Sequence, residues 1–569
     1  MRKLVYTTLL AAVSLYVLNV LSGMQRSLGT TAALTSAHHA GVAMAFGLLF
    51  LSRILVGRMP VAARGVGHAL SAAMLFMGLQ AAISAVDWPG QLAGIQSGAH
   101  FGLALVVQGL AVLAAALSNH WLHADGPAVR LQFRSPFARL SLLTAAALLG
   151  LMITGAITSR VSSAGCPTWP LCTPETFDAW LNLAHRGAVL ITIFLAGAML
   201  FRAWRTQRSQ TTVLVTATAS VVLLAAQALL GARLPLDAPA YLVAVHQATA
   251  MAVWATMALL VAAVGLAART PSDEREEAAL WRSRTGMAGD LLRLTKPVVV
   301  ALLLVTTFAG MVIGARALPA WDLLLWTMLG GFLAAGGSGA INQYIDRFDD
   351  SQMQRTQKRP IPAGRLTPGE GLAFGVAATL LSFYLMLAFV NLAAALLTLA
   401  GIVYYVVLYS LLLKKTTVQN IVIGGGAGAI PPLVGWAAAT GGLNVPALFL
   451  FAIVFLWTPP HFWALALVRR SDYARANVPM LPVVRGEKET QRQIWIYTLE
   501  LVTLTLLWPA FGLGGSVYLI GAGALGLWLL SAAWKVWKQG GNKLAWKMYR
   551  YSSMYLAFLF AVMMVDALV

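Results

Sequence analysis

The chain has 569 residues, of which 59% are hydrophobic and 11% are charged, and its mean hydropathy is +0.75. These values exclude an ordinary soluble globular protein and indicate an integral membrane protein. The formal net charge of +20 would suit a nucleic-acid-binding protein, but the Lys and Arg residues lie in short loops between apolar runs. The charge therefore reflects membrane topology, and we expect no nucleic acid as a partner.

Apolar runs of about twenty residues recur from end to end, and each is long enough to cross a hydrocarbon core of about 30 Å as a helix. About seventeen such runs are present, without alternation of apolar and polar residues, so we predict an all-α polytopic membrane protein rather than a barrel. Residues 1–22 begin Met-Arg-Lys and resemble a signal peptide, but the run has the length of a span and no obvious cleavage site. We interpret it as an uncleaved first helix.

Basic loops alternate with loops that carry few basic residues, which predicts a cytoplasmic N-terminus and an extracytoplasmic C-terminus. The loops expected on the cytoplasmic side are 53–64, 130–139, 202–208, 269–296, 343–370, 414–415, 469–492 and 535–550. The stretch 269–290 mixes both signs of charge and contains no span. It is predicted to be a cytoplasmic linker between about eight spans in residues 1–268 and about nine in residues 291–569.

Four histidines lie within apolar spans of the first half: His39, His100, His185 and His246. The first two are 61 residues apart, as are the last two, and the second pair follows the first by 146 residues. This duplication predicts two four-helix repeats, about 1–135 and 136–268. The register selects His39 rather than His38, because Gly41 then matches Gly187.

In the predicted topology all four histidines fall near the outer ends of even-numbered helices. The partners of each pair would then face each other at one depth of a four-helix bundle. A flat macrocycle with axial iron needs that arrangement, because imidazole nitrogens must approach the metal from opposite faces. Polar contact between helices is the alternative, and it is the commoner role of a lone intramembrane histidine.

The only two cysteines, Cys166 and Cys172, stand in the segment CPTWPLC of a predicted outward-facing loop. Two cysteines with this spacing on the oxidising side favour a disulfide that closes the loop. A metal site would need more ligands. A redox role for the pair stays open.

Over roughly residues 1–268 this pattern resembles heme A synthase, a family of two four-helix bundles with a histidine pair in each, and NLAHRG at 182–187 looks like its His-Arg signature. The resemblance implies that His185 and His246 hold a resident heme b. It also implies that His39 and His100 hold the substrate heme, whose ring methyl is oxidised to a formyl group. The family has a functional Glu three residues before the first histidine, where this chain has Ser36.

The second half contains a dense charge cluster, NQYIDRFDDSQMQRTQKRP, at the end of an apolar run. Asn342, Asp346 and Asp350 recur every four residues and would line one face of a helix that continues past the membrane surface. Aligned carboxylates repel one another unless a cation joins them, and oxygen ligands suit Mg²⁺. Basic residues suited to phosphate oxygens follow in the same cluster, at Arg355, Lys358 and Arg359. Two later loops add further bases and one acid: Lys414, Lys415, Arg469, Arg470 and Asp472. We interpret the cluster as a diphosphate site; a solvated loop would explain the bases but not the ordered acids.

Over roughly residues 290–569 the chain resembles the UbiA-type intramembrane prenyltransferases, and specifically protoheme IX farnesyltransferase (heme O synthase). The blocks that carry the likeness include TTVQNIVIGGGAGAIPPLVGW, WTPPHFWALAL and DYARANVPMLPVVRG. The resemblance implies a nine-helix bundle in which Asn342, Asp346 and Asp350 bind Mg²⁺-diphosphate. The bases implied to neutralise the leaving group are Arg355, Arg359, Lys414 and Lys415. Broader superfamily members have a second Asp-x-x-x-Asp, whereas here Asp472 is followed four residues later by Ala476.

Two features of this half leave alternatives open. His461 could ligate the acceptor heme or serve as a polar packing residue. Glycines 424–426 and Gly428 would allow either close helix approach or a flat ligand against the backbone.

The two resemblances name consecutive steps, so we expect a bifunctional enzyme of the bacterial inner membrane. It would farnesylate heme b with farnesyl diphosphate to heme O and then oxidise heme O to heme A, with heme b and Mg²⁺ as cofactors. Its other partners would be membrane lipid, an unidentified electron donor and terminal oxidase assembly factors. Two alternatives remain: the first half is a non-catalytic diheme cytochrome b-like module, or it is a heme transporter or chaperone.

Overall fold

The computed structural model describes residues 1–28, 32–59, 63–86, 88, 92–123, 131–158, 173–233, 239–282, 286–476, 478–512 and 514–569. Within these ranges the chain forms helices and turns without any strand. Seventeen of the described helices are long and apolar enough to cross a membrane. The protein is therefore a multi-pass all-α membrane protein, and the predicted fold class is confirmed. It divides into two compact units, Met1–Arg284 and Thr285–Val569.

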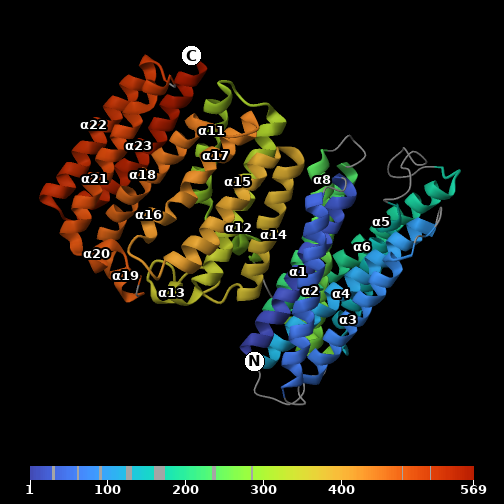
Figure 1. Ribbon diagram of the computed structural model, residues 1–569. Helices are drawn as coiled ribbons and strands as arrows, with labels where there is room; N and C mark the ends of the chain where they lie inside the picture. Colours follow the sequence, from blue (N-terminus) through green and yellow to red (C-terminus); the bar gives the residue numbers. More distant parts are fainter. Residues whose placement is uncertain are drawn as a thin grey trace. The chain divides into compact units, whose positions relative to one another are not determined.

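The first unit repeats one arrangement of four helices. Each helix packs against its neighbours in sequence and the fourth returns to the first, so α1–α4 form one closed ring and α5–α8 another (Figure 1). The histidine-bearing helices, α2 with α4 and α6 with α8, lie diagonally across their rings. The described helices of this unit are α1 (Arg2–Leu28), α2 (Ala32–Gly57), α3 (Arg64–Ser84), α4 (Leu92–His123), α5 (Pro136–Thr158), α6 (Phe177–Thr206), α7 (Thr211–Arg233), α8 (Ala240–Ala267) and α9 (Pro271–Arg282).

Polar side chains join the two rings where α1 and α4 pack against α8. The Tyr16 hydroxyl donates to the Ala248 carbonyl at 3.2 Å, and the Trp254 indole N–H donates to the Leu105 carbonyl at 2.6 Å. Lipid tails are as apolar as the helix surfaces, so the hydrophobic effect does not drive helices together in a membrane. Close packing and interhelical hydrogen bonds of this kind hold the rings together instead.

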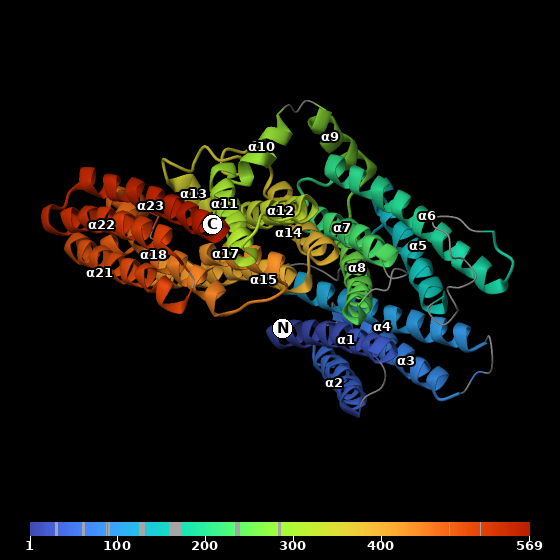
Figure 2. The same cartoon turned by 90° about the horizontal axis from the view of Figure 1, so that it is seen from above.

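Part of the predicted linker is a helix that belongs to the first unit. Amphipathic α9 packs on α6 (Figure 2) and carries two buried carboxylates. Glu274 accepts from the Phe137 backbone N–H at 3.1 Å and forms an ion pair with Arg202, while Glu277 pairs with Arg269 at 2.5 Å. The linker is therefore docked over residues 271–282 rather than free.

The first turn of α9 is stabilised by its own sequence. The Thr270 backbone N–H and hydroxyl donate to the Asp273 carboxylate at 2.7 and 2.9 Å. These bonds favour the ionised acid and lower the pKa of Asp273 below its ordinary value. An ionised acid at this position also interacts favourably with the N-terminal end of the helix dipole.

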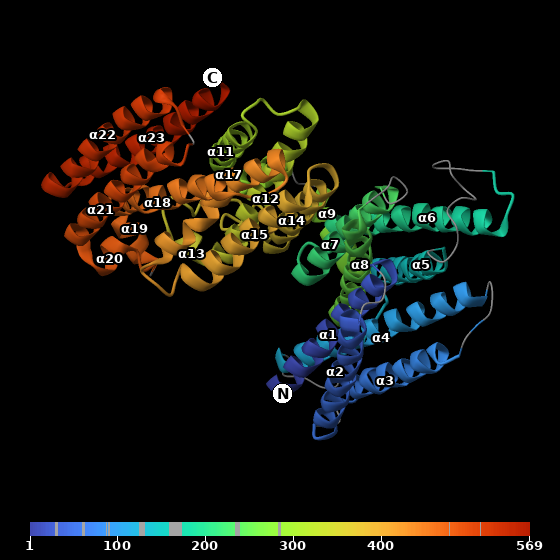
Figure 3. The same cartoon turned by 45° about the horizontal axis from the view of Figure 1, so that its top comes forward.

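The second unit combines a ring of five spans with a ring of four. The five-membered ring contains α11, α12, α14, α15 and α17, and the four-membered ring contains α18, α21, α22 and α23 (Figure 3). The described elements are α10 (Met287–Leu294), α11 (Pro297–Ala315), α12 (Trp321–Ile345), α13 (Arg347–Gln352), α14 (Pro368–Phe389), α15 (Leu392–Val403), the π-helix η3 (Tyr404–Leu413), α16 (Asn420–Gly424), α17 (Gly426–Thr440), α18 (Val445–Val468), α19 (Arg470–Arg475), α20 (Leu481–Val484), α21 (Gly486–Leu507), the 3₁₀ turn η4 (Trp508–Phe511), α22 (Ser516–Gln539) and α23 (Asn542–Leu568).

Close backbone contact fixes the position of α11 against α17. A Cβ atom on Gly310 would collide with the Pro432 carbonyl, and one on Gly435 would collide with the Thr307 carbonyl. Only glycine permits backbones to approach this closely, which is the usual basis of tight helix pairs in membranes. These contacts close the five-membered ring.

We predict that Glu274→Gln destabilises the first unit, because Arg202 and the Phe137 N–H lose a buried charged partner. The loss should be about 1–3 kcal/mol, because the Phe137 N–H is left with a weaker acceptor while Arg202, whose side chain is 40% exposed, can turn to solvent. Thermal unfolding of the purified chain in detergent measures this. Glu276→Gln is the matched control, since Glu276 is exposed on the same helix. Equal midpoints for the two variants would contradict the docking of α9.

Candidate active site

A nearly continuous helical path carries the acidic face out of α12. The Asp346 N–H donates to the Asn342 carbonyl at 2.9 Å, and the Asp350 N–H donates to the Asp346 carbonyl at 2.8 Å, so the repeat continues into α13. The side chains of Asn342, Asp346 and Asp350 therefore lie in line, and these residues are only 4%, 3% and 3% exposed. Carboxylates this buried require charged or hydrogen-bonding partners.

Each of the two buried carboxylates contacts one cation. Asp346 Oδ2 lies 2.5 Å from Lys414 Nζ, and Asp350 Oδ2 lies 2.6 Å from Arg359 Nη1. Asp346 Oδ2 also accepts from the Asn342 amide at 2.8 Å. The site thus consists of two ion pairs, and each carboxylate or cation could instead pair with an ion from outside the chain.

The neighbouring lysines 414 and 415 diverge. Lys415 pairs with Asp349 at 2.7 Å on the outer side of the helix, and its side chain is 56% exposed. Arg355 and Lys358 are also exposed. Of the predicted phosphate-binding bases, Lys414 and Arg359 are the two whose ion pairs reach the buried acids.

Within the part of the chain that the structure describes, Asp472 forms no ion pair with the acidic face; its neighbour Tyr473 joins this region through an apolar contact. Met353, which follows α13, packs with Tyr473 and Val478 in one buried cluster. This contact joins the connection after α12 to the connection after α18. Asp472 itself is buried and pairs with Arg475 on the next turn of α19.

Lys296 belongs to the site and was missed in the sequence. Its amine donates to the Asn342 side-chain oxygen at 2.9 Å and to the Tyr405 hydroxyl at 3.2 Å. Its backbone is left-handed, with φ +55°, at the start of α11. This conformation costs a non-glycine residue about 1–2 kcal/mol, and such strain tends to occur at functional sites. Nothing in residue spacing connects Lys296 with Asn342, which lies 46 residues later.

The π-helix η3 supplies the opposite wall. The Lys414 N–H donates to the Tyr409 carbonyl at 2.9 Å. This carbonyl lies five residues earlier instead of the four of an α-helix, so the turn is wider. Ser410 accepts from the Asn342 amide at 3.1 Å, and Lys414 reaches Asp346. The widened register therefore aims both Ser410 and Lys414 at α12, and π-turns are frequent at functional sites.

The glycine segment and His461 both take part in packing. A Cβ on Gly424 would collide with the Tyr409 ring, and one on Gly426 would lie 2.6 Å from the Tyr404 hydroxyl. Buried His461 stacks between Trp457 and Tyr549, with ring centroids 4.2 and 4.5 Å away. Its Nδ1 lies 2.8 Å from the Ser552 hydroxyl. A heme contact at His461 stays a prediction.

Comparison with known proteins places this site in a family. The UbiA prenyltransferase family matches residues 303–559. A protoheme IX farnesyltransferase of Roseiflexus sp. (strain RS-1) is 41% identical over 488 residues, which is 81% of this chain and 91% of that protein. The chain belongs to the UbiA prenyltransferase family.

The relatives of this prenyltransferase differ in how much of the chain they match. The Roseiflexus castenholzii protoheme IX farnesyltransferase is 41% identical over 514 residues, covering 85% of this chain and 95% of its own length. That of Gloeobacter violaceus is 51% identical over 280 residues, covering 49% of this chain and 92% of its own length. Since the second unit is half of the chain, the Roseiflexus alignments extend well into the first unit.

Solved structures of lower identity also match this prenyltransferase. A digeranylgeranylglyceryl phosphate synthase is 19% identical with a TM-score of 0.44, over 50% of this chain and 99% of that one. A UbiA homolog from Archaeoglobus fulgidus bound to GPP and Mg²⁺ is 16% identical with a TM-score of 0.37, over 48% and 99%.

In the second ring of the first unit, the two histidines have polar neighbours on adjacent helices. His185 Nδ1 lies 3.0 Å from the Thr154 hydroxyl, and His246 Nε2 lies 2.9 Å from the Gln227 amide nitrogen. His246 Nδ1 and the side-chain oxygens of Gln227 and Gln247 are buried without a partner among the described residues. Unpaired buried polar atoms are costly, so this region is suited to a polar ligand or a metal.

The first ring is arranged differently. His100 Nε2 lies 3.1 Å from the Gln80 amide nitrogen, and its Nδ1 lies 2.6 Å from the Ser84 hydroxyl. His39 is exposed on α2, and its ring centroid lies 6.0 Å from that of His38. Cys166 and Cys172 lie outside the described residues, so their predicted disulfide stays a prediction.

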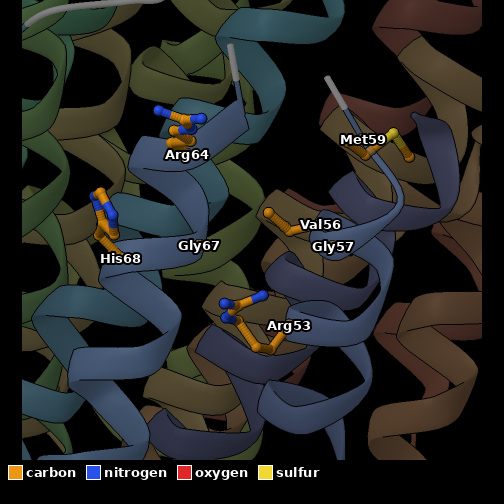
Figure 4. A pocket seen from close by; sticks show the side chains of 7 residues that line it. All are labelled: Arg53, Val56, Gly57, Met59, Arg64, Gly67 and His68. Atoms are coloured by element: carbon orange, nitrogen blue, oxygen red, sulfur yellow. The ribbon is translucent and has the colours of Figure 1, made fainter. Parts of the chain in front are cut away.

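A cavity of about 240 Å³ opens between the end of α2 and the start of α3 (Figure 4). Arg53, Arg64 and His68 give it a basic lining. It lies at the opposite end of α2 from His39, so it does not belong to the histidine site. Its basic residues fit the positive-inside pattern of the predicted cytoplasmic loops.

We predict that Lys414→Met destabilises this prenyltransferase far more than Lys415→Met. The first variant leaves the buried Asp346 charge with its cation removed, at about 3–5 kcal/mol, whereas the second loses an exposed ion pair worth at most about 1 kcal/mol. Thermal unfolding in detergent compares the two variants. Similar losses would show that the Asp346 pair is not buried.

Proposed function

We propose that the chain is a bifunctional enzyme of heme A biosynthesis. The second unit transfers a farnesyl group from farnesyl diphosphate to heme b, and the first unit oxidises a ring methyl of the resulting heme O to a formyl group. The observation that carries the transferase function is the buried line Asn342–Asp346–Asp350, in a family member that is 41% identical to protoheme IX farnesyltransferases over most of its length.

The acidic face fits Mg²⁺ by the chemistry of its donors. Asp346 and Asp350 supply carboxylate oxygens on one helical face, and Asn342 supplies an amide oxygen. Within the described residues no group of three or more His, Cys, Asp or Glu side chains could hold a metal alone. Because this face offers only three oxygen-bearing side chains, a bound Mg²⁺ would keep waters and share its coordination with diphosphate oxygens. When bound, Mg²⁺ would neutralise charge on the departing diphosphate.

Lys414, Arg359 and Lys296 would stabilise the leaving group. Two of them now pair with the acids, and the third bonds to Asn342. With Asp346 and Asp350 holding the metal, Lys414 and Arg359 would be released to bind phosphate oxygens. The carbon–oxygen bond of farnesyl diphosphate then breaks, and diphosphate leaves with the electron pair. The heme vinyl group attacks the allylic cation, and water adds to the carbocation left behind and releases a proton.

The first unit supports heme binding through the placement of its histidines. Each pair comes from diagonal helices of one ring, which allows ligands to reach a flat macrocycle from both faces. His185 and His246 would hold heme b, because buried polar atoms beside His246 lack partners. His39 and His100 would hold the substrate heme, and exposed His39 suits a site that exchanges its ligand.

A second candidate is a farnesyltransferase joined to a non-catalytic diheme module. Two observations favour it: Ser36 stands where heme A synthases have a functional Glu, and the Roseiflexus proteins, which align well into the first unit, bear only the name of the transferase. In both cases we infer a bacterial inner-membrane protein with a cytoplasmic N-terminus and an extracytoplasmic C-terminus, since its loops alternate in basic content. Membrane lipid, an electron donor and terminal oxidase assembly factors are its inferred partners.

We predict that the hemes extracted from expressing cells separate the two steps. Mass spectrometry should find heme A with the intact chain, heme O with His39→Ala and only heme b with Asp346→Asn. Asp322→Asn, a change at the other, exposed end of α12, should match the intact chain. Heme O without heme A from the intact chain would contradict the oxidase function. Heme A from His39→Ala would contradict the role of His39, and heme O from Asp346→Asn would contradict the transferase site.

We also predict that chelation stops the transferase without emptying the histidine sites. EDTA should abolish transfer of labelled farnesyl to heme b by the purified chain, and Mg²⁺ should restore it, because the acidic face needs a cation to bind diphosphate. The visible spectrum of bound heme should not change. Full activity in EDTA would argue against Mg²⁺ at Asp346 and Asp350.

A further inference from the structure

In both rings of the first unit, the third helix gives a glutamine to the histidine of the fourth. Gln80 on α3 reaches His100, and Gln227 on α7 reaches His246, through the same ring nitrogen, Nε2. The glutamines are 147 residues apart and the histidines 146, so the pairs occupy matching positions of the repeat within one residue.

One turn after each glutamine the rings differ. In the first ring the Ser84 hydroxyl donates to the Gln80 carbonyl at 3.0 Å, so its oxygen is available to accept from His100 Nδ1–H at 2.6 Å. Those bonds fix one tautomer of His100, with the proton on Nδ1 and the lone pair on Nε2.

In the second ring the matching residue is Gly231, which has no hydroxyl. His246 Nδ1 is buried without a partner among the described residues. A Cβ on Gly231 would lie 3.1 Å from His246 Cε1, so a small side chain there would stand against the same edge of the ring. The two histidines thus share the glutamine and differ in the bond at the second nitrogen.

We propose that the Ser84 hydroxyl strengthens His100 as an axial ligand and so lowers the reduction potential of its heme site, and that Gly231 leaves His246 without the same support. This rests on the heme sites of the proposed function. An imidazole that donates its second N–H is held in place and becomes a more basic ligand. Stronger donation favours ferric iron and lowers the potential, and hydrogen bonding around axial ligands is one of the protein's levers on that potential. Ser84 therefore lowers the potential of the His100 site. In the second ring the Thr154 hydroxyl donates to the Leu151 carbonyl at 2.8 Å and can accept from His185 Nδ1–H at 3.0 Å, so the hydrogen bond that this ring lacks is the one at His246.

Ser84 is a positioning residue in this proposal, since it acts through His100. A purely structural role would be to satisfy the Gln80 carbonyl in the last turn of α3, which Ser84 also does. Loss of that bond would affect stability but would not move a heme potential. The potential therefore separates the two roles.

The test is an optical redox titration of the full chain, purified in detergent and loaded with heme b. Ser84→Ala should raise one of the two potentials and leave the other unchanged, and it should weaken heme retention at that site roughly 10- to 100-fold. Ser84→Thr, which keeps the hydroxyl, should restore both properties. Ser71→Ala is the matched control, because Ser71 lies on the same helix and its hydroxyl bonds Arg53 instead.

Gly231→Ser and Gly231→Ala test the second ring as a pair. Both add a Cβ beside His246, and only serine adds the hydroxyl, so the difference between them isolates the hydrogen bond. We expect the potential that Ser84→Ala leaves unchanged to be lower in Gly231→Ser than in Gly231→Ala.

Normal heme uptake with unmoved potentials in Ser84→Ala, or equal potentials in the two Gly231 variants, would overturn this proposal alone. A chain that takes up no heme would overturn the proposed function of the first unit together with it.

Discussion

The buried carboxylates of Asp346, which follows α12, and Asp350, in α13, are the constraint on which the second unit depends. Asp346 and Asp350 are almost fully shielded from solvent, so each must have a cation within reach. The cations come from other segments: Lys414 from the end of the π-helix and Arg359 from the connection that follows α13. Neutralising the acids therefore brings several connections together in one polar cluster. A cation that pairs with an acid can also bind a phosphate oxygen when the acid is otherwise neutralised.

The surrounding helices fix the geometry of this cluster. Glycine contacts hold α11 against α17 with almost no space between backbones, so the start of α11, where Lys296 takes a left-handed conformation, is set relative to the ring. The strain at Lys296 and the widened turn of η3 are two local departures from ideal helix geometry, and both direct a side chain at Asn342. Departures of this kind are tolerated where the neighbouring packing over-determines them.

The first unit follows another rule. It has few ionisable groups in its spans, and its polar side chains serve either to join helices or to surround the histidines. The two rings share one arrangement of helices, yet single positions give each ring its own environment, as Ser84 and Gly231 show. A repeated scaffold can thus carry two sites of one type with different properties.

The sequence by itself determined the fold class, the number of spans and the acidic face of α12, because these depend on hydropathy and on helical periodicity, which are local properties of the chain. It could not separate Lys414 from Lys415, find Lys296 or Ser410, or show that residues 271–282 dock on α6. These features depend on which distant segments come into contact and on the π-helical geometry of η3, which changes the direction of the side chains that follow it. Only tertiary packing decides such meetings, since contacts between distant segments leave no periodic pattern in a single sequence.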